Sequence, residues 1–181
     1  MSITYAEAVG TERRAATAEE ARAIASPLRL RILRLCLDAP LTNKQLAEAL
    51  DRDPASVLYH VRRLVRTGFL TPGEERRGTR GAREVPYRST GKSWRIEVVD
   101  ETQGRANTAA LVDAFIEDAR RVGAENVEAA RLGLRLTPEE HEELKRRLGE
   151  LLDDFAGRAS HGEPWSLFVG VHRDDRPVLP D

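Results

Sequence analysis

The chain has 181 residues, of which 40% are hydrophobic and 33% charged, enough apolar content for the core of one domain or two small ones. No segment approaches the roughly 20 apolar residues that span a bilayer, and the N-terminus lacks the pattern of a signal peptide. A single cysteine, Cys36, excludes an intrachain disulfide and a multi-cysteine zinc site. We therefore expect a cytoplasmic protein that has no contact with a membrane.

The net charge of −1 conceals an uneven distribution along the chain. Residues 22–95 carry 16 basic and 7 acidic side chains, a net charge of +9, whereas residues 96–181 carry −8 and residues 1–21 carry −2. A basic block beside an acidic one indicates that only the basic block faces a polyanion.

Three short helices are predicted between residues 17 and 50. Thr17 with Glu20, and Thr42 with Gln45, have the three-residue spacing of a capping box, which begins a helix. Pro27 suits the first turn of the helix between them, where its missing N–H group costs nothing. Apolar residues recur at helical spacing in all three segments.

A fourth helix, residues 54–67, is strongly amphipathic. Asp53 is its predicted N-cap, Pro54 takes the first helical position, and Gly68 follows its end. On a helical wheel its aliphatic side chains fall on one side. An ordinary solvated face remains an alternative interpretation of the opposite side, which holds Ser56, Tyr59, His60, Arg62, Arg63 and Arg66.

After Gly68 the pattern changes to a hairpin. Residues 69–71 and 85–88 are predicted strands, and they flank a glycine-punctuated loop at 72–84. A flexible solvated loop is the alternative to a functional one. The cationic side chains of this loop are Arg76, Arg77, Arg80 and Arg83.

The rest of the chain predicts a long helix and a strand-helix-strand unit. Helical spacing of apolar residues runs from about Arg105 to Ala129, after a polar break at 102–105. Residues 132–136 and 165–171 are strand candidates, and a helix with a buried leucine stripe begins at Pro138 between them. The fold class is therefore α+β.

Two consecutive helices followed by a hairpin predict a winged helix-turn-helix domain. In that arrangement the second helix enters the major groove of DNA, and the wing lies over the backbone or the minor groove. We expect Ser56, Tyr59 and His60 at or near base edges, and Arg62, Arg63 and Arg66 on phosphates. The wing arginines suit a narrow minor groove. Helix N-termini also hold phosphates, which adds Thr42, Asn43 and Lys44 to the predicted DNA-binding residues.

Three stretches, ARAIASPLRLRILRLC (21–36), LTNKQLAEAL (41–50) and SVLYHVRRLVRTGFL (56–70), resemble the winged-helix core of ArsR-type bacterial transcriptional regulators. The resemblance covers residues 17–92. It implies a homodimer that binds a palindromic operator in double-stranded DNA, usually to block transcription, with the helices flanking the winged domain in the dimer interface. The chain thus divides into a tail (1–16), a DNA-binding domain (17–95) and a region for dimerisation and effector sensing (96–181).

Dimer contacts are expected on the long helix, because its apolar stripe is broader than a small winged domain needs. Packing within the chain is the alternative. An effector, if one binds, is an unidentified small molecule, since the sequence shows no convergent polar pocket. The predicted interface residues are Val112, Phe115, Ile116, Ala119 and Val122.

No metal, cofactor or catalytic role is predicted. The segment 41–50 lacks the cysteine pair of metal-sensing ArsR-type regulators, and Cys36 lies on an apolar helix face. His141, His161 and His172 have no ligand spacing. Residues 96–181 contain no nucleophile and base pattern, so we expect no enzyme. A winged module that binds proteins instead of DNA remains the alternative function.

Overall fold

The computed structural model describes residues 13–77, 83–158 and 162–174. Its winged domain is followed by two longer helices, α5 (Glu101–Val122) and α6 (Pro138–Ala156), with the short 3-10 turn η4 (Ala124–Asn126) between them. The winged domain contains, in chain order, β1 (Arg14–Ala15), α1 (Ala18–Ile24), α2 (Pro27–Leu35), β2 (Leu41–Thr42), α3 (Asn43–Leu50), α4 (Pro54–Arg66), β3 (Leu70–Pro72), β4 (Arg76–Arg77), β5 (Arg83–Glu84), β6 (Pro86–Ser89), η3 (Lys92–Trp94) and β7 (Ile96–Glu97).

The predicted helix starts are confirmed. Thr17 accepts a hydrogen bond from the backbone N–H of Glu20, whose carboxylate accepts one from the Thr17 N–H. Thr42 and Gln45 form the same reciprocal cap at α3. Asp53 caps α4 through the N–H of Ser56, at 2.8 Å. These caps satisfy backbone donors that a helix leaves unpaired at its first turn, so they fix where each helix begins.

The turn between α3 and α4 is held by two local features. Asp51 adopts the left-handed conformation, with φ of 50°, and its N–H bonds back to the carbonyl of Glu48 at 3.3 Å, which ends α3. The Asn43 amide then donates to the Pro54 carbonyl at 2.9 Å. This bond joins the first residue of α3 to the first residue of α4, so it fixes how the two helices meet.

A three-stranded antiparallel sheet, in the order β2-β6-β3, forms the base of the wing. Beyond it, β4 pairs with β5 in the same antiparallel sense, with Arg76 opposite Glu84. The predicted hairpin is therefore confirmed. One pairing was not predicted: β1 runs parallel to β7, with Arg14 opposite Ile96, so the last residues of the expected tail belong to the folded domain.

The core lies between the helices of the winged domain and its small sheet. Its largest fully buried side chains come from α2, α3, α4 and the start of β3, and none exceeds 2% exposure. They are Phe69, Ile32, Leu46, Leu64, Leu70, Val57, Val61 and Cys36. The side of α4 predicted to be apolar thus completes the core. These elements confirm the α+β class with an N-terminal winged helix-turn-helix domain.

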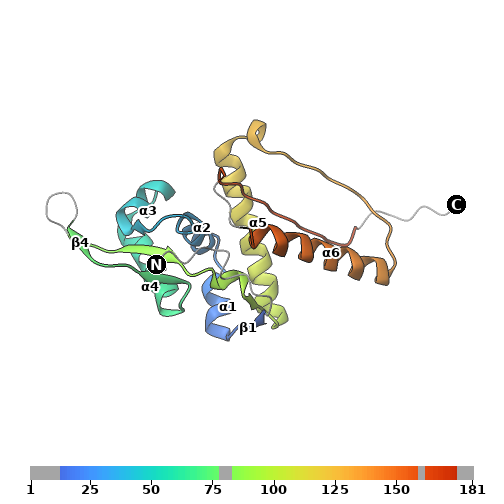
Figure 1. Cartoon of the computed structure of the whole chain (residues 1–181), viewed down its shortest axis with the longest axis horizontal. Coiled ribbons are helices and arrows are strands. Elements are labelled where there is room, and N and C mark those ends of the chain that lie inside the picture. Colours follow the sequence, from blue (N-terminus) through green and yellow to red (C-terminus); the bar gives the residue numbers. More distant parts are fainter. Residues whose placement is uncertain (1–12, 78–82, 159–161, 175–181) are drawn as a thin grey trace.

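Helix α5 passes between the winged domain and the C-terminal part, as Figure 1 shows. It starts at Glu101, because Asp100 caps it through the N–H of Gln103, so the expected polar break at 102–105 is wrong. It ends at Gly123 rather than near Ala129, because Gly123 has a φ of 86° that side-chain-bearing residues rarely adopt.

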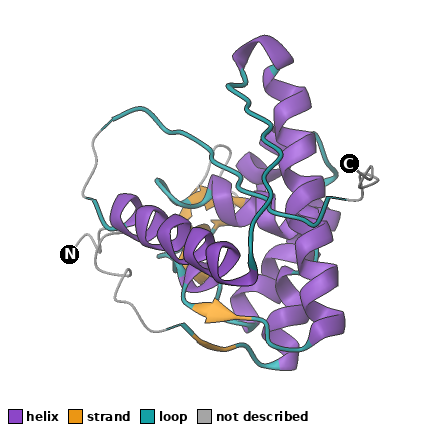
Figure 2. Cartoon of the chain, turned by 90° about the vertical axis from the view of Figure 1, so that its right-hand side faces the viewer, coloured by secondary structure: helices purple, strands orange, loops and turns teal. Residues whose placement is uncertain are grey.

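The C-terminal part differs from the prediction. Pro138 and a Thr137 capping box do begin α6, but its leucine stripe is not buried: Leu151 is 53% exposed and Phe155 58%. Residues 132–136 and 165–171 are not strands, because neither has a neighbouring strand in the described residues. Both are extended loops, which Figure 2 draws in teal without strand arrows. No helix of the described residues combines the length and the apolar character needed to cross a membrane.

Candidate nucleic-acid interface

Helix α4 divides cleanly into a buried and an open side. Val57, Val61 and Leu64 are fully buried in the core. On the other side Ser56 and Arg62 are exposed, and Tyr59 is 61% exposed. Three of the residues predicted to contact DNA are therefore accessible on the side of α4 that faces away from the core.

The His60 side chain is half-buried and contacts Arg29 of α2. The Arg29 guanidinium is 3.3 Å from His60 Nδ1, while its other nitrogens donate to the carbonyls of Ala23 and Arg22. Burial, followed by the charges of Arg29 and Arg63, lowers the pKa of His60. A neutral imidazole accepts from Arg29 and can still donate from its second nitrogen. The Tyr59 ring meets the His60 ring edge-on, with centroids 5.3 Å apart.

The two remaining arginines of the face differ in their surroundings. Arg66 is exposed but pairs with Glu19 of α1 at 3.1 Å. Arg63 is half-buried, and its Nε has no hydrogen-bond partner among the described residues. An exposed ion pair contributes little, so Glu19 is an acidic neighbour that a phosphate can replace at small cost.

Two of the three residues predicted to bind DNA at the start of α3 have structural roles instead. Thr42 is buried, with 3% exposure, and its hydroxyl caps the helix. The Asn43 amide donates a hydrogen bond to the Pro54 carbonyl. Lys44 is exposed, and its ammonium group forms a surface ion pair with the Glu48 carboxylate at 3.9 Å. Of the three predicted contacts here, Lys44 is the one whose side chain is available to a ligand.

The wing presents cations at its described edges. Arg76 and Arg77 are exposed on β4, and Arg83 on β5 is exposed although it pairs with Glu75 at 3.0 Å. The prediction for Arg80 lies outside the described residues. Figure 1 shows β4 projecting from the same end of the molecule as α3 and α4, so the wing and the two helices share one end.

The residues expected in a dimer interface occupy different environments on α5. Ile116 is 38% exposed and Val122 48%, while Ala119 is half-buried. Phe115 already stacks on Phe168 of the same chain, with ring centroids 5.0 Å apart. The buried side of α5, including Ala110 and Ala114, packs within the chain. The helix therefore serves intrachain packing on one side and leaves apolar residues open on another.

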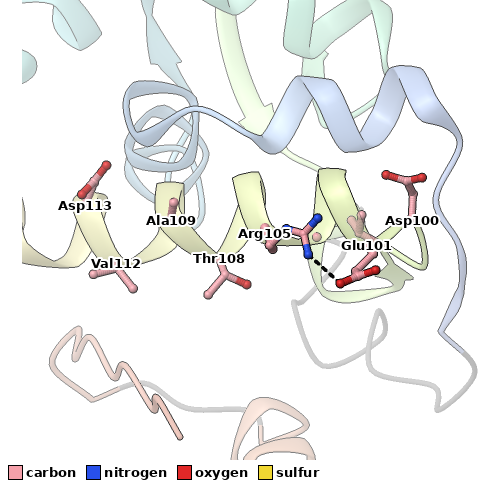
Figure 3. Close-up of a pocket in the computed structure, with 9 residues that line it drawn as sticks. Asp100, Glu101, Arg105, Thr108, Ala109, Val112 and Asp113 are labelled. Carbon is pink, nitrogen blue, oxygen red and sulfur yellow. Dashed lines mark hydrogen bonds and ion pairs between the residues drawn. The ribbon is translucent and has the colours of Figure 1, made fainter. Parts of the chain in front are cut away.

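An open groove of about 690 Å³ runs along the first half of α5. Val112, the remaining predicted interface residue, lines it together with Thr108 and Ala109 (Figure 3). At one end Arg105 forms an ion pair with Glu101 at 2.5 Å. Asp100 and Asp113 also line the groove, so apolar and acidic side chains share it.

Cys36 lies in the core, and burial raises the pKa of its thiol to about 11. The prediction that it is a small buried apolar residue is confirmed. His141 and His172 are described, whereas His161 is not. Within the described ranges, no three His, Cys, Asp or Glu side chains are grouped as metal ligands.

Residues 24–72 match the family model of a helix-turn-helix domain. With the hairpin that follows, these residues form a winged helix-turn-helix domain. No curated protein matches the chain significantly.

Among solved structures, the chain is similar to reduced HlyU from Vibrio cholerae, with 22% identity over 49% of this chain and 77% of that chain and a TM-score of 0.33. AdcR, the adhesin competence repressor of Streptococcus pyogenes, is 18% identical over 71% and 80%, with a TM-score of 0.32. MepR of S. aureus in its DNA complex is 17% identical over 77% and 80%, with a TM-score of 0.29. Such scores give no information on ligand, partner or assembly.

Two residues of this surface were missed at the sequence level. Arg29 sits in an apolar helical segment, where it looks like a solvated charge, yet it is only 9% exposed and contacts His60. Glu19 is close to Arg66 only because α1 packs near the end of α4. Neither contact has a local pattern, since 31 and 47 residues separate the partners.

Proposed function

We propose that the chain is a homodimeric, ArsR-type repressor that binds a palindromic operator through α4 and the basic wing. The observation that carries the proposal is the division of α4. Its aliphatic side fills the core, while Ser56, Tyr59 and Arg62 remain exposed on the opposite side. The exposed cations Arg76 and Arg77 extend this surface on the wing.

The chemistry of this surface suits a major groove about 12 Å wide, which admits a single helix. A hydroxyl at Ser56 and a phenol at Tyr59 can donate to or accept from base edges, and Arg62 can bond a guanine or a phosphate. Because two half-sites lie roughly 34 Å apart, a palindrome requires a second copy. The open apolar residues of α5, Ile116 and Val122, support that dimer.

Selection of bound sequences from random duplex DNA tests the proposal. We expect enrichment of two inverted half-sites, centred about 10 base pairs apart or a multiple of one turn. A single unpaired half-site would contradict dimeric binding. Failure to enrich any sequence, together with no affinity for random duplex at low salt, would favour the protein-binding module instead.

The salt dependence of binding tests which arginines contact phosphate. Replacing Arg62 and Arg63 by alanine is expected to weaken binding to all sequences and to lower the slope of log K against log salt by about 2. The matched control is the pair Arg146→Ala and Arg147→Ala, two neighbouring arginines exposed on α6. An anisotropy titration in which both double variants keep the wild-type slope would remove Arg62 and Arg63 from the interface.

We further propose that the protein acts by binding in the cytoplasm and not by catalysis. If a small-molecule effector exists, the groove along α5 is the place for it. Its lining includes Val112 and Thr108, on the same helix whose Glu117 and Asp118 contact α2 of the winged domain. A ligand there would act on DNA binding through this connection.

A further inference from the structure

Residues 163–173 form an extended segment that pairs with no strand of the described residues, and their side chains alternate between two sides. Ser166 accepts a hydrogen bond from Arg34 of α2, and Phe168 stacks on Phe115 of α5, so these two even-numbered side chains hold the segment against the helices. The odd-numbered side chains from 165 to 171 are large, apolar and exposed. Their exposures are 79% for Trp165, 73% for Leu167, 43% for Val169 and 51% for Val171.

The backbone of this segment is also open. None of residues 163–173 makes a backbone–backbone hydrogen bond to another described residue, although the segment crosses the C-terminal part as a long trace (Figure 1). Period-two alternation with unpaired N–H and C=O groups is the state of a strand that lacks a neighbour. Such an edge pairs with another strand when one is offered.

The sequence of the segment is complementary to itself when it is reversed about Phe168. In that register Trp165 faces Val171 and Leu167 faces Val169, so each large apolar side chain meets a β-branched one. Glu163 faces Arg173, which places opposite charges at both ends. Between these two residues the segment contains no Asp, Glu, Lys or Arg.

Backbone chemistry agrees with the same register. If Phe168 occupies the central non-hydrogen-bonded pair, every even-numbered residue is at a non-hydrogen-bonded position. Pro164, which has no N–H to donate, then lies where none is needed. The odd-numbered residues supply the hydrogen-bonded pairs.

We propose that residues 163–173 pair antiparallel with the same residues of a second copy, across a two-fold axis at Phe168. The proposal deepens, and rests on, the proposed homodimer by naming the strand that joins the two copies. A two-stranded ribbon alone is marginally stable, so it needs a surface beneath it. The even-numbered side of the ribbon supplies that surface contact, because Phe168 of each copy lies on Phe115 and brings both α5 helices, with their exposed Ile116, under the ribbon.

Charge reversal of the end pairs tests the register in the full chain. Glu163→Arg alone, or Arg173→Glu alone, places like charges opposite each other twice in the symmetric dimer and is expected to raise the dimer Kd about tenfold. The double variant restores opposite charges and should return the Kd to within about twofold of wild type. Glu128→Arg, the same charge change at an exposed site outside the segment, is the control. Sedimentation equilibrium provides the measurement.

A disulfide test is independent of charge. Non-hydrogen-bonded partners have Cα atoms about 4.5 Å apart, within the range of a disulfide, so Phe168→Cys should yield an oxidised covalent dimer. In the same register residue 166 faces residue 170 of the second copy, so Ser166→Cys should not yield a covalent dimer. Cys36 does not interfere, because it is buried.

The outcomes separate this inference from the proposed function. A wild-type dimer with an unchanged Kd in both single charge variants, or equal cross-linking at 166 and 168, overturns the strand pairing but leaves the homodimer. A wild-type monomer, with the segment bare or covered by residues 131–136 of its own chain, overturns both. Affinity of the same variants for random duplex DNA reports separately on the winged domain.

Discussion

Phe69, Ile32 and Leu64 of the winged domain are enclosed to 1% exposure or less, whereas Trp165 and Leu132 of the C-terminal part are 79% and 78% exposed. Both regions have the apolar content of a folded unit. The difference lies in what surrounds each apolar face. In the winged domain the helices and the sheet cover one another, while in the C-terminal part the helix and the two extended segments leave their apolar sides open.

The two regions meet at one charged contact that is well enclosed. Arg31 of α2 is only 6% exposed and pairs with Glu117 at 3.1 Å and Asp118 at 3.0 Å on α5. Helix α5 therefore belongs to both regions, since one side of it packs against the winged domain and Phe115 on another side contacts Phe168 of the C-terminal segment. Stability should therefore be unevenly distributed, and point substitutions can map it.

The largest effect is expected in the core of the winged domain. Phe69→Ala should lower the free energy of unfolding by about 3–5 kcal/mol, because it removes a fully buried ring and leaves a cavity. Leu167→Ala, at low concentration where the chain is monomeric, should change it by less than about 0.5 kcal/mol. Denaturant unfolding followed by circular dichroism measures both. Equal losses would mean that the two regions are equally packed.

Removing the contact of Arg31 with Glu117 and Asp118 should cause the next largest loss in the free energy of unfolding. Arg31→Met removes the buried partner of Glu117 and Asp118, which keep only the exposed Arg52 and Arg121, and is expected to cost about 3 kcal/mol, the low end for a buried pair. Arg52 also approaches Glu117, at 4.0 Å, but is 57% exposed. Arg52→Met should therefore change unfolding by less than about 0.5 kcal/mol. Similar losses in both variants would show that burial is irrelevant to this contact.

A smaller, pH-dependent loss is expected at Glu20. Its buried carboxylate accepts hydrogen bonds from Arg14 at 2.6 Å and 2.8 Å and pairs with Lys92 at 2.6 Å, and these partners, Arg14 first, hold its pKa well below its usual range. Glu20→Gln should cost about 2 kcal/mol at pH 7. Because the carboxyl of the unfolded chain takes up its proton near pH 4.5, the extra stability that Glu20 gives the wild type is present above that pH and decreases as the pH falls below it.

Unfolding of wild type and Glu20→Gln between pH 7 and pH 3 provides the measurement. The difference between them should shrink on the acid side only. Glu19→Gln, which alters an exposed pair with Arg66, is the matched control and should show almost no difference at any pH. A constant gap down to pH 3 would contradict the assignment to Glu20.

The smallest effect is expected at His60. Its pKa is lowered by burial and by Arg29 and Arg63, so the folded state favours the neutral ring. The unfolded ring takes up its proton near pH 6.5; stability is therefore full above that pH and declines below it. His60→Gln should remove this decline between pH 6.5 and pH 5, whereas His141→Gln on α6 should retain it. Thermal unfolding across that range distinguishes the two.

Local patterns predicted the winged domain well, because each signal acts within one turn of chain. Thr17, Thr42 and Asp53 cap helices with side chains three residues from their partners, so the sequence alone determines these starts. The polar break expected at 102–105 failed for the opposite reason. Its residues have weak helical patterning, but Asp100 caps the helix before them and their inward side packs on the winged domain.

In the candidate site, too, local spacing predicted some features and tertiary packing decided others. The period of α4 was enough to separate the six polar residues from the core, since side-chain direction on a helix depends only on spacing. It did not show that Thr42 is buried, or that Glu19 pairs with Arg66, because those facts arise where α1, α3 and α4 pack together.

By itself the sequence determined the helix starts, the apolar side of α4, the hairpin and the concentration of positive charge in residues 22–95. These depend on residue spacing and on charge, which any reader of the chain can count. Only the tertiary structure decided that Arg31 joins α2 to α5, that Arg29 lies beneath His60, and that the two C-terminal strand candidates have no neighbouring strand in the part of the chain that the structure describes. The physical reason is that a strand or a buried charge is stable only with a partner, and the partner's position is set by the packing of distant segments.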